Sequence, residues 1–302
     1  MDLDTALINS AILIFLIVLG YLLKRVGLFK QEDSQVLSKI MLYVTLPAVL
    51  VNAFRDFTLD PSLAVFIAIG IGANVVLLVA GWYLGRREKP LVHAMYMVCM
   101  PGFNIGSFAI PFVDALFPAQ MLEVVMFDIG NTVMNCGINY SFAAMQVQEG
   151  RRFSLRALWR TLVRTFPFDL YIGLFLLNLF HIQLPQPIYQ LADTVAGANA
   201  LVVMLMLGIM FEVRLDKESL RQVVHLVVGR VGVQLVMAAL LLCLLPFPLE
   251  QRVIGALTVC APISGMATVF CGKLNCDPSV YGTATSLTIP ISIAVMLALS
   301  WM

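Results

Sequence analysis

Charged residues are scarce in this chain, since Asp, Glu, Lys and Arg together make up 12% of its 302 residues. Soluble domains usually carry about 25% charged residues. Because 60% of this chain is hydrophobic, a soluble globular fold is nearly excluded. The formal net charge of +1 gives no basic or acidic excess, so we expect no nucleic-acid partner.

Motifs of metal, cofactor and catalytic sites are also missing. None of the six cysteines forms a CxxC pair, and most lie in apolar runs, where cysteine usually packs as a small hydrophobe. The sequence has no HExxH or GxSxG motif and no GxxxxGK phosphate loop. We therefore expect no metal ion, no cofactor, no enzymatic activity, and no direct coupling to ATP hydrolysis without a partner subunit.

Long apolar runs, in contrast, follow one another along the whole chain. A spanning helix needs roughly 20 largely apolar residues, because the hydrocarbon core is about 30 Å thick and each residue rises about 1.5 Å. The first run lacks the basic region and cleavage site of a signal peptide, so it is predicted to be a retained span. The sequence predicts an all-α integral membrane protein with ten transmembrane helices, at 5–23, 36–54, 62–84, 91–116, 121–147, 158–180, 188–211, 219–244, 249–272 and 279–302.

Lysine and arginine are distributed unevenly between the joints that separate these spans. Short loops on the cytoplasmic side retain such residues, and here alternate joints hold nearly all of them, whereas the opposite joints hold only Arg55 and Arg252. We therefore predict that both termini lie on the non-cytoplasmic side. The basic joints contain Lys24, Arg25, Lys30 and Lys39; Arg86, Arg87 and Lys89; Arg151, Arg152, Arg156, Arg160 and Arg164; Arg214, Lys217 and Arg221; and Lys273.

The joint near 149–160 divides the chain into two halves of five spans, 1–150 and 151–302. Because five is odd, two such repeats would sit upside down relative to each other, as in many secondary transporters. Sequence identity between the halves is slight, so the argument for repetition is positional.

The fourth span of each half contains a proline, in MPGFNIG at 100–106 and in APISGMA at 261–267. Either proline alone is more simply explained as a kink in a packed helix. The matched placement of Pro101 and Pro262 favours paired broken helices, whose freed backbone groups must face protein, water or a ligand rather than lipid. Neighbouring glycines lower the cost of leaving helical geometry, namely Gly102, Gly106 and Gly265.

Three stretches resemble the auxin efflux carrier family: GYLLKRVGLF with LSKIMLYVTLPAVLVNAF within 20–54, FNIGSFAIPF at 103–112, and IYQLADTVAGANALVVMLMLGIMFEV at 188–213. This family includes the plant PIN exporters of auxin and bacterial permeases credited with malonate or malate transport. The resemblance implies two inverted five-helix repeats in a bacterial-type inner-membrane permease, with helices 4 and 9 broken at prolines that cross near the substrate. It further implies a scaffold of helices 1, 2, 6 and 7, often dimeric, and a mobile elevator bundle of helices 3–5 and 8–10.

Two departures from the plant members affect the expected ligand and regulation. Those proteins place asparagines near both crossing prolines, whereas here Asn104 follows Pro101 and Gly265, beside Ser264, occupies the corresponding place after Pro262. This difference argues against auxin itself as the ligand. The long hydrophilic loop of many plant members is missing, so regulation through it is not expected.

Asn104 is the first candidate for substrate contact. A neutral amide donates to a carboxylate without leaving a permanent charge in hydrocarbon when the site is empty, and half-helix N-termini near the breaks would add partial positive charge. Interhelical hydrogen bonding, worth roughly 1 kcal/mol, is the alternative.

Asp128, Asn131 and Asn135 recur at three- and four-residue spacing and therefore share one helical face. A carboxylate at the depth of Asp128 is costly unless it is protonated, paired or hydrated. Proton coupling through Asp128 and a structural ion pair remain equal alternatives.

Arg230 lies about 16 Å into its span at 1.5 Å per residue, near the midplane. Its guanidinium should face a cavity, a carboxylate such as Asp128, or an anionic substrate, and structural pairing and substrate binding remain open. Ser264 and Thr268 could donate hydroxyls from the second half, or bond back to their own helix.

These features predict a secondary active transporter of small organic anions, mono- or dicarboxylates, with a membrane-lipid environment and a homodimeric option. The alternative is a channel or ligand-sensing membrane protein that uses the same cavity. The candidate substrate-binding residues are Pro101, Gly102, Asn104, Asn131, Asn135, Arg230, Pro262, Ser264, Gly265 and Thr268, and the candidate coupling residue is Asp128.

Overall fold

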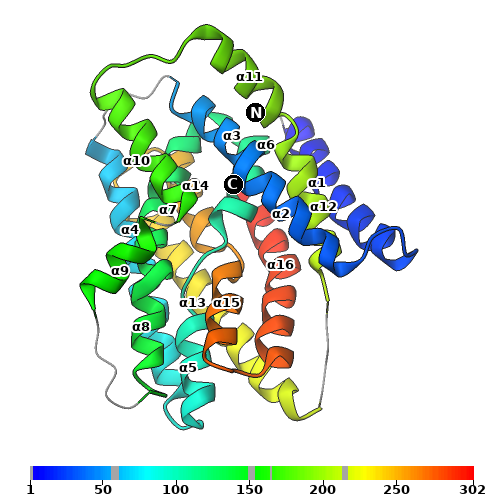
Figure 1. The fold of residues 1–302 in the computed structure, drawn as a ribbon, viewed down its shortest axis with the longest axis vertical. Coiled ribbons are helices and arrows are strands. Elements are labelled where there is room, and N and C mark those ends of the chain that lie inside the picture. The colour runs from blue at the N-terminus through cyan, green and yellow to red at the C-terminus, as the bar shows by residue number, and fades with distance from the viewer. Residues whose placement is uncertain (1–2, 56–60, 149–153, 164, 213–216) are drawn as a thin grey trace.

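The computed structural model describes residues 3–55, 61–148, 154–163, 165–212 and 217–302. Within these residues the chain is helical, and its one extended contact is an isolated antiparallel β-bridge (Figure 1). Four arginines of the predicted basic joints lie outside the described residues: Arg151, Arg152, Arg164 and Arg214.

Six helical segments in the described residues are long and apolar enough to cross a membrane, judged by length and composition. They overlap the first, second, third, seventh, eighth and tenth predicted spans, with ends that differ by up to five residues. Large apolar side chains on their outer faces, such as Phe15 and Val79, are exposed, as expected for helices that contact lipid. The six segments are Ile8–Arg25, Gln31–Ala53, Leu63–Gly85, Gln186–Met210, Ser219–Leu244 and Pro278–Ser300.

The remaining predicted spans consist of shorter helices or of helices joined by π-helical turns. Figure 1 shows these pieces packed among the long helices. The elements are α1 (Leu3–Arg25), α2 (Ser34–Ile40), η2 (Met41–Thr45), α3 (Leu46–Ala53), α4 (Pro61–Gly85), α5 (Pro90–Cys99), η3 (Ile105–Ala109), α6 (Ile110–Leu116), α7 (Met121–Val133), η5 (Met134–Ile138), α8 (Asn139–Ala144), α9 (Leu155–Leu162), α10 (Phe166–Leu179), α11 (Gln186–Ala196), α12 (Asn199–Met210), α13 (Lys217–Leu244), α14 (Leu249–Val259), α15 (Gly265–Lys273) and α16 (Pro278–Ser300), with short 3-10 turns at Gln31–Asp33 and Pro118–Gln120.

The single helix predicted at 158–180 is divided into α9 and α10. Thr165, between them, has an extended backbone (φ −97°, ψ 100°), and Pro167 lies in the first turn of α10, a position that proline tolerates. The 14 residues of α10 extend only about 21 Å, less than the hydrocarbon thickness of about 30 Å. Counting apolar residues did not reveal this break.

The backbones of helices α4 and α7 lie in close contact. A Cβ atom added at Gly130 would lie 2.2 Å from the carbonyl oxygen of Ile67, and one added at Gly70 would lie 2.3 Å from that of Phe127. Small residues permit such contacts between membrane helices. This close packing places the polar residues of α4 beside those of α7.

Candidate functional site

Two helix interruptions meet inside the protein. Residues 100–104, which include Pro101, separate α5 from η3, and residues 260–264, which include Pro262, separate α14 from α15. Both segments leave helical geometry, so their buried peptide groups need partners from elsewhere in the fold. We call these two segments together the crossover.

The two segments of the crossover bond to each other. Phe103 and Ile263 form an antiparallel bridge, and both side chains are almost completely buried. Each segment thereby provides an acceptor for one backbone donor of the other. The backbone amide of Asn104 donates to the Pro262 carbonyl at 3.0 Å, and the backbone amide of Ser264 donates to the Gly102 carbonyl at 3.2 Å.

Side chains form hydrogen bonds with the outer backbone edges of the two bridged segments. The Asn131 Oδ1 atom accepts from the Phe103 backbone amide at 3.0 Å, and its Nδ2 donates to the Phe103 carbonyl at 3.0 Å. The side-chain amide of Asn131 thus pairs with Phe103 as a neighbouring peptide would. On the other side, the Ile263 amide donates to Thr288 Oγ1 at 3.2 Å. Both backbone groups of Phe103 and the backbone amide of Ile263 therefore have side-chain partners.

Arg230 from α13 occupies the centre of the crossover and has no exposed surface. Its planar guanidinium can donate in several directions, and the carbonyls it contacts lie where α5 and α14 end, at the negative ends of the helix dipoles. Nη1 donates to the carbonyls of Cys99 (3.1 Å), Met100 and Pro101 (3.3 Å), and Nη2 to those of Gly102 (3.1 Å), Ala261 (3.2 Å) and Pro262 (3.3 Å).

A chain of polar side chains runs through the adjoining helices. Asp128 accepts at Oδ2 from the Tyr171 hydroxyl (2.6 Å) and at Oδ1 from Asn131 Nδ2 (2.9 Å). Asn74 Nδ2 donates to Asn131 Oδ1 at 3.2 Å, and Asn74 Oδ1 accepts from Asn139 Nδ2 at 3.1 Å. Among the described residues Asp128 forms no ion pair with Arg230; its carboxylate bonds to Tyr171 and Asn131 instead.

Gly102 joins this polar chain to the crossover. Its amide donates to Asn74 Oδ1 at 2.8 Å, and its φ of +78° lies in the left-handed region that favours glycine. A Cβ atom at this position would lie 2.6 Å from Asn135 Oδ1. Both the conformation and the available space therefore require glycine.

Asn135 and Ser264 bring the two halves of the sequence together. Asn135 Nδ2 donates to Ser264 Oγ at 2.7 Å, and the same oxygen accepts from the Met266 amide at 3.2 Å as the N-cap of α15. Thr268, in contrast, bonds back to its own helix, at the Gly265 carbonyl (2.7 Å). That arrangement is the second of the two alternatives that the sequence left open for the hydroxyls.

The side chain of Asn104 is half-buried at the beginning of η3. Its backbone contributes to the crossover, but no side-chain hydrogen bond to its amide is found within the described residues. A free amide donor therefore lies beside the N-terminal end of a broken helix.

A cavity of about 310 Å³ lies between α15, α16 and the end of α12. Hydroxyl groups dominate its polar lining, and among the candidate residues Thr268 contributes to it. The residues that line it are Gln31, Met210, Glu212, Thr268, Pro278, Ser279, Gly282, Thr283, Thr285 and Ser286.

Three residues of the polar chain were missed in the sequence. Asn139 extends the spacing of Asn131 and Asn135 by four residues, so the stripe itself contained that signal. Asn74 is a lone amide in an otherwise apolar run, which marks it as unusual without identifying its partner. Tyr171 gave no signal, because nothing local distinguishes its hydroxyl from those of other tyrosines.

One comparison with known proteins gives a match. The model of a family described as membrane transport protein matches residues 5–159, about half of the chain. That region runs from α1 into α9 and includes the first helix interruption, Asn74 and the polar stripe on α7.

No curated protein matches the sequence. The family match confirms the resemblance over a region that contains two of the three sequence stretches, those within 20–54 and at 103–112. It identifies the chain as a membrane transport protein, and its several apolar helices are consistent with multiple membrane passes. The chain therefore belongs to the auxin efflux carrier family of membrane transport proteins.

Proposed function

We propose that this protein is a secondary active transporter of small organic anions, mono- or dicarboxylates. The observation that carries the proposal is the difference between the C-terminal and the N-terminal helix ends at the crossover. Arg230 donates to carbonyls at the C-terminal ends of α5 and α14. The N-terminal ends at the crossover are those of η3 and α15. Those N-terminal ends favour a negative charge, and a carboxylate is the simplest organic group that supplies one.

Asn104 gives this anion site a specific donor. Its side-chain amide, which has no hydrogen bond within the described residues, lies at the start of η3, where it could donate to a carboxylate. Ser264 caps α15 at the corresponding place in the second half. A small carboxylate between these helix ends would be held by helix dipoles and amide donors, while Arg230 stays bonded to the carbonyls of the crossover.

The proposed architecture is ten spans in two inverted repeats, 1–150 and 151–302. Two observations support it: each half contributes one segment to the antiparallel bridge, and Asn74 and Arg230 each lie thirteen residues after the first residue of α4 and α13. Both face the crossover, one as an acceptor and one as a donor.

The proposed mechanism is elevator-type alternating access. Of the ten predicted spans, the first, second, sixth and seventh would form a scaffold with a homodimer contact. The third to fifth and the eighth to tenth would move as a bundle. Polar contacts between the two parts are then expected to change during transport, among them Tyr171 to Asp128 (2.6 Å) and Asn9 Nδ2 to the Ala115 carbonyl (2.9 Å). The basic joints favour an orientation with both termini on the non-cytoplasmic side, and the family resemblance favours a bacterial inner membrane.

Transport assays in liposomes test this function. Purified protein should take up labelled malonate, malate or a related carboxylate with saturable kinetics, and unlabelled substrate inside should accelerate entry by counterflow. Empty liposomes provide the baseline. Single-channel currents without counterflow would instead identify a channel, and folded protein without saturable flux for a broad carboxylate panel would contradict the proposal.

The Asn104→Ala variant should transport poorly while folding normally. Loss of a hydrogen bond to a charged group costs about 1.5–3 kcal/mol, which corresponds to a rise in KM of roughly tenfold to a hundredfold. Because the Asn104 side chain has no hydrogen bond in the described residues, the thermal midpoint should change little. The measurement is initial uptake rate against substrate concentration, with thermal unfolding of the same preparation.

Asn178→Ala is the matched control, because the Asn178 side-chain amide donates to the Leu174 carbonyl of its own helix at 3.0 Å. It should leave KM unchanged. Wild-type kinetics in Asn104→Ala would remove Asn104 from the site.

The Asp128→Asn variant should separate proton coupling from substrate binding. Its oxygen can accept from Asn131 and its amide can donate to a rotated Tyr171 hydroxyl, so both contacts of Asp128 have replacements. We expect counterflow to persist while the stimulation of uptake by a pH gradient is lost. Asp169→Asn, an exposed acid in the first turn of α10, should retain that stimulation. Full pH-gradient dependence in Asp128→Asn would show that another group couples.

A further inference from the structure

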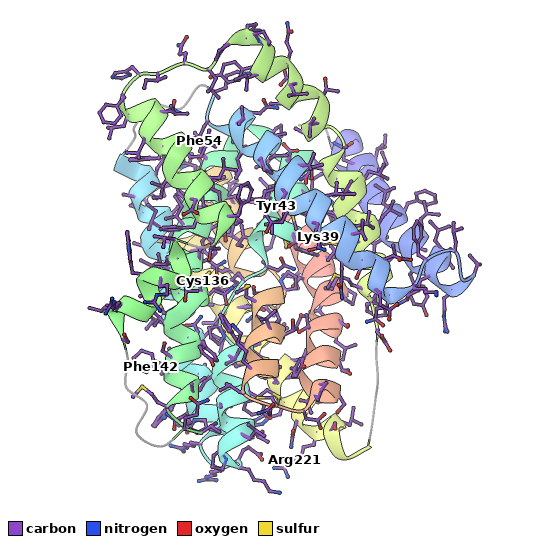
Figure 2. The ribbon with its side chains drawn as sticks, viewed as in Figure 1. Lys39, Tyr43, Phe54, Cys136, Phe142 and Arg221 are labelled. Carbon is purple, nitrogen blue, oxygen red and sulfur yellow. The ribbon has the colours of Figure 1, made fainter. Side chains whose placement is uncertain are left out.

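In the part of the chain that the structure describes, helix α9 packs on the protein through the face that carries Leu158 and Leu162. Leu162 forms a small buried cluster with Cys136 and Phe168, and Leu158 packs against it. The contact with η5 is tight, because a Cβ atom added at Gly137 would lie 2.4 Å from Leu158 Cδ1. Figure 1 shows α9 at the left edge of the molecule, and Figure 2 labels Cys136 on the neighbouring segment.

The next face of α9 is apolar and uncovered. Leu155 and Trp159 are 72% and 64% exposed. At about 100° per residue, these two side chains lie within one narrow stripe beside the anchored face. Tryptophan is enriched at the boundary between acyl chains and headgroups, where its ring is half apolar and half polar. The stripe therefore fits the upper part of a lipid leaflet.

Two guanidinium groups follow this stripe around the helix. Arg156 and Arg160 are exposed, and neither has an acidic partner among the described residues. The sequence from 151 to 168 contains five arginines and no acidic residue. Arginine binds phosphate oxygens through paired donors, so the basic stripe is complementary to the headgroups above the region that the apolar stripe fits.

We propose that α9 is a binding site for anionic phospholipid. Leu155 and Trp159 enter the boundary between acyl chains and headgroups, and Arg156 and Arg160 bind the phosphates of anionic headgroups. Around the helix, the face packed on the protein is followed by the apolar stripe and then by the basic stripe. This order is that of a helix lying in a membrane interface. Through Leu158, a lipid bound here also braces η5, the turn that contains Asn135. The site is separate from the crossover and does not depend on the transported substrate.

Fluorescence of Trp159 tests this site directly. Replacing Trp82 and Trp301, both exposed, by phenylalanine leaves Trp159 as the single tryptophan of the chain. In nanodiscs, phosphatidylglycerol with brominated chains in a phosphatidylcholine background should quench this fluorescence more than the same fraction of brominated phosphatidylcholine. Each arginine removed should lower the preference about fivefold, so Arg156→Gln/Arg160→Gln should nearly abolish it.

Arg86→Gln/Arg87→Gln is the matched control, since it removes two exposed arginines from another basic joint. It should retain the preference for phosphatidylglycerol. Equal quenching by the two lipids in the parent protein, or an unchanged preference in Arg156→Gln/Arg160→Gln, would overturn the proposal. Loss of the preference on adding inorganic phosphate would also overturn it, because the site would then bind a soluble anion rather than a lipid headgroup.

Discussion

Replacing Arg230 by methionine should destabilise the protein by about 2–6 kcal/mol. The carbonyls of Met100 and Pro101 have no second donor in the described part of the chain, and each buried carbonyl left unpaired costs about 1–3 kcal/mol. Methionine can fill the volume but cannot donate. The expected result is a fall of roughly 10 °C in the thermal midpoint, together with loss of transport.

Arg230→Lys should be intermediate between the wild type and the methionine variant. An ammonium group supplies three donors from one point, whereas the guanidinium supplies five in a plane and bonds to carbonyls of both interrupted segments. Lysine can therefore bind one segment or the other, but it cannot bridge both as Arg230 does.

Arg221→Met provides the control on the same helix. Its side chain is 87% exposed and lies 3.9 Å from Glu88, at the lower end of the molecule (Figure 2), and exposed ion pairs contribute about 0–1 kcal/mol. In differential scanning fluorimetry, wild type and Arg221→Met should have about the same thermal midpoint, Arg230→Lys a lower one and Arg230→Met the lowest. An unchanged midpoint in Arg230→Met would mean that the carbonyls find other donors.

Gly102→Ala should cost about 2–5 kcal/mol, for two separate reasons. An alanine at φ +78° pays about 1–2 kcal/mol for the left-handed conformation, and its Cβ would overlap Asn135 Oδ1 at 2.6 Å, where overpacking costs about 1–3 kcal/mol. Displacing Asn135 would also disturb its bond to Ser264. Both thermal stability and transport should fall.

Gly265→Ala tests whether this effect is specific to the first half. A Cβ atom at Gly265 would have no atom within 4 Å, and the residue begins α15 with no unusual φ. Its thermal midpoint should remain within about 2 °C of the wild type. Equal losses of stability in the two variants would show that small size, rather than backbone conformation and contact with Asn135, governs both positions.

Local signals in the sequence indicated some of the residues that the structure brings together at the crossover. Pro101 and Pro262 indicated where backbone donors are missing, and the spacing of Asp128, Asn131 and Asn135 indicated a shared polar face. The depth of Arg230 predicted that its charge must be compensated. Each of these predictions needed only helical geometry and the cost of burying polar groups in hydrocarbon.

The partners of these residues depended on contacts between distant parts of the chain. Arg230 bonds to carbonyls that are about 130 and about 30 residues away in sequence, and no local pattern brings those carbonyls to one point. Asn74 was overlooked for the same reason, since its role depends on the close packing of α4 on α7. The division of 158–180 into two helices was missed because hydrophobicity does not report where a helix begins.

Arg230 also gives the protein a fixed electrical property. It is a fully buried cation whose partners in the crossover are neutral carbonyls, while the buried acid Asp128 bonds to Tyr171 and Asn131. If α7 and α13 move together in the proposed bundle, the two charges cancel when Asp128 is ionised and leave one positive charge when it is protonated. An elementary charge moved across the full membrane potential gains or loses about 2.3 kcal/mol per 100 mV. The voltage across the membrane would therefore act mainly on the protonated carrier and bias which side it faces.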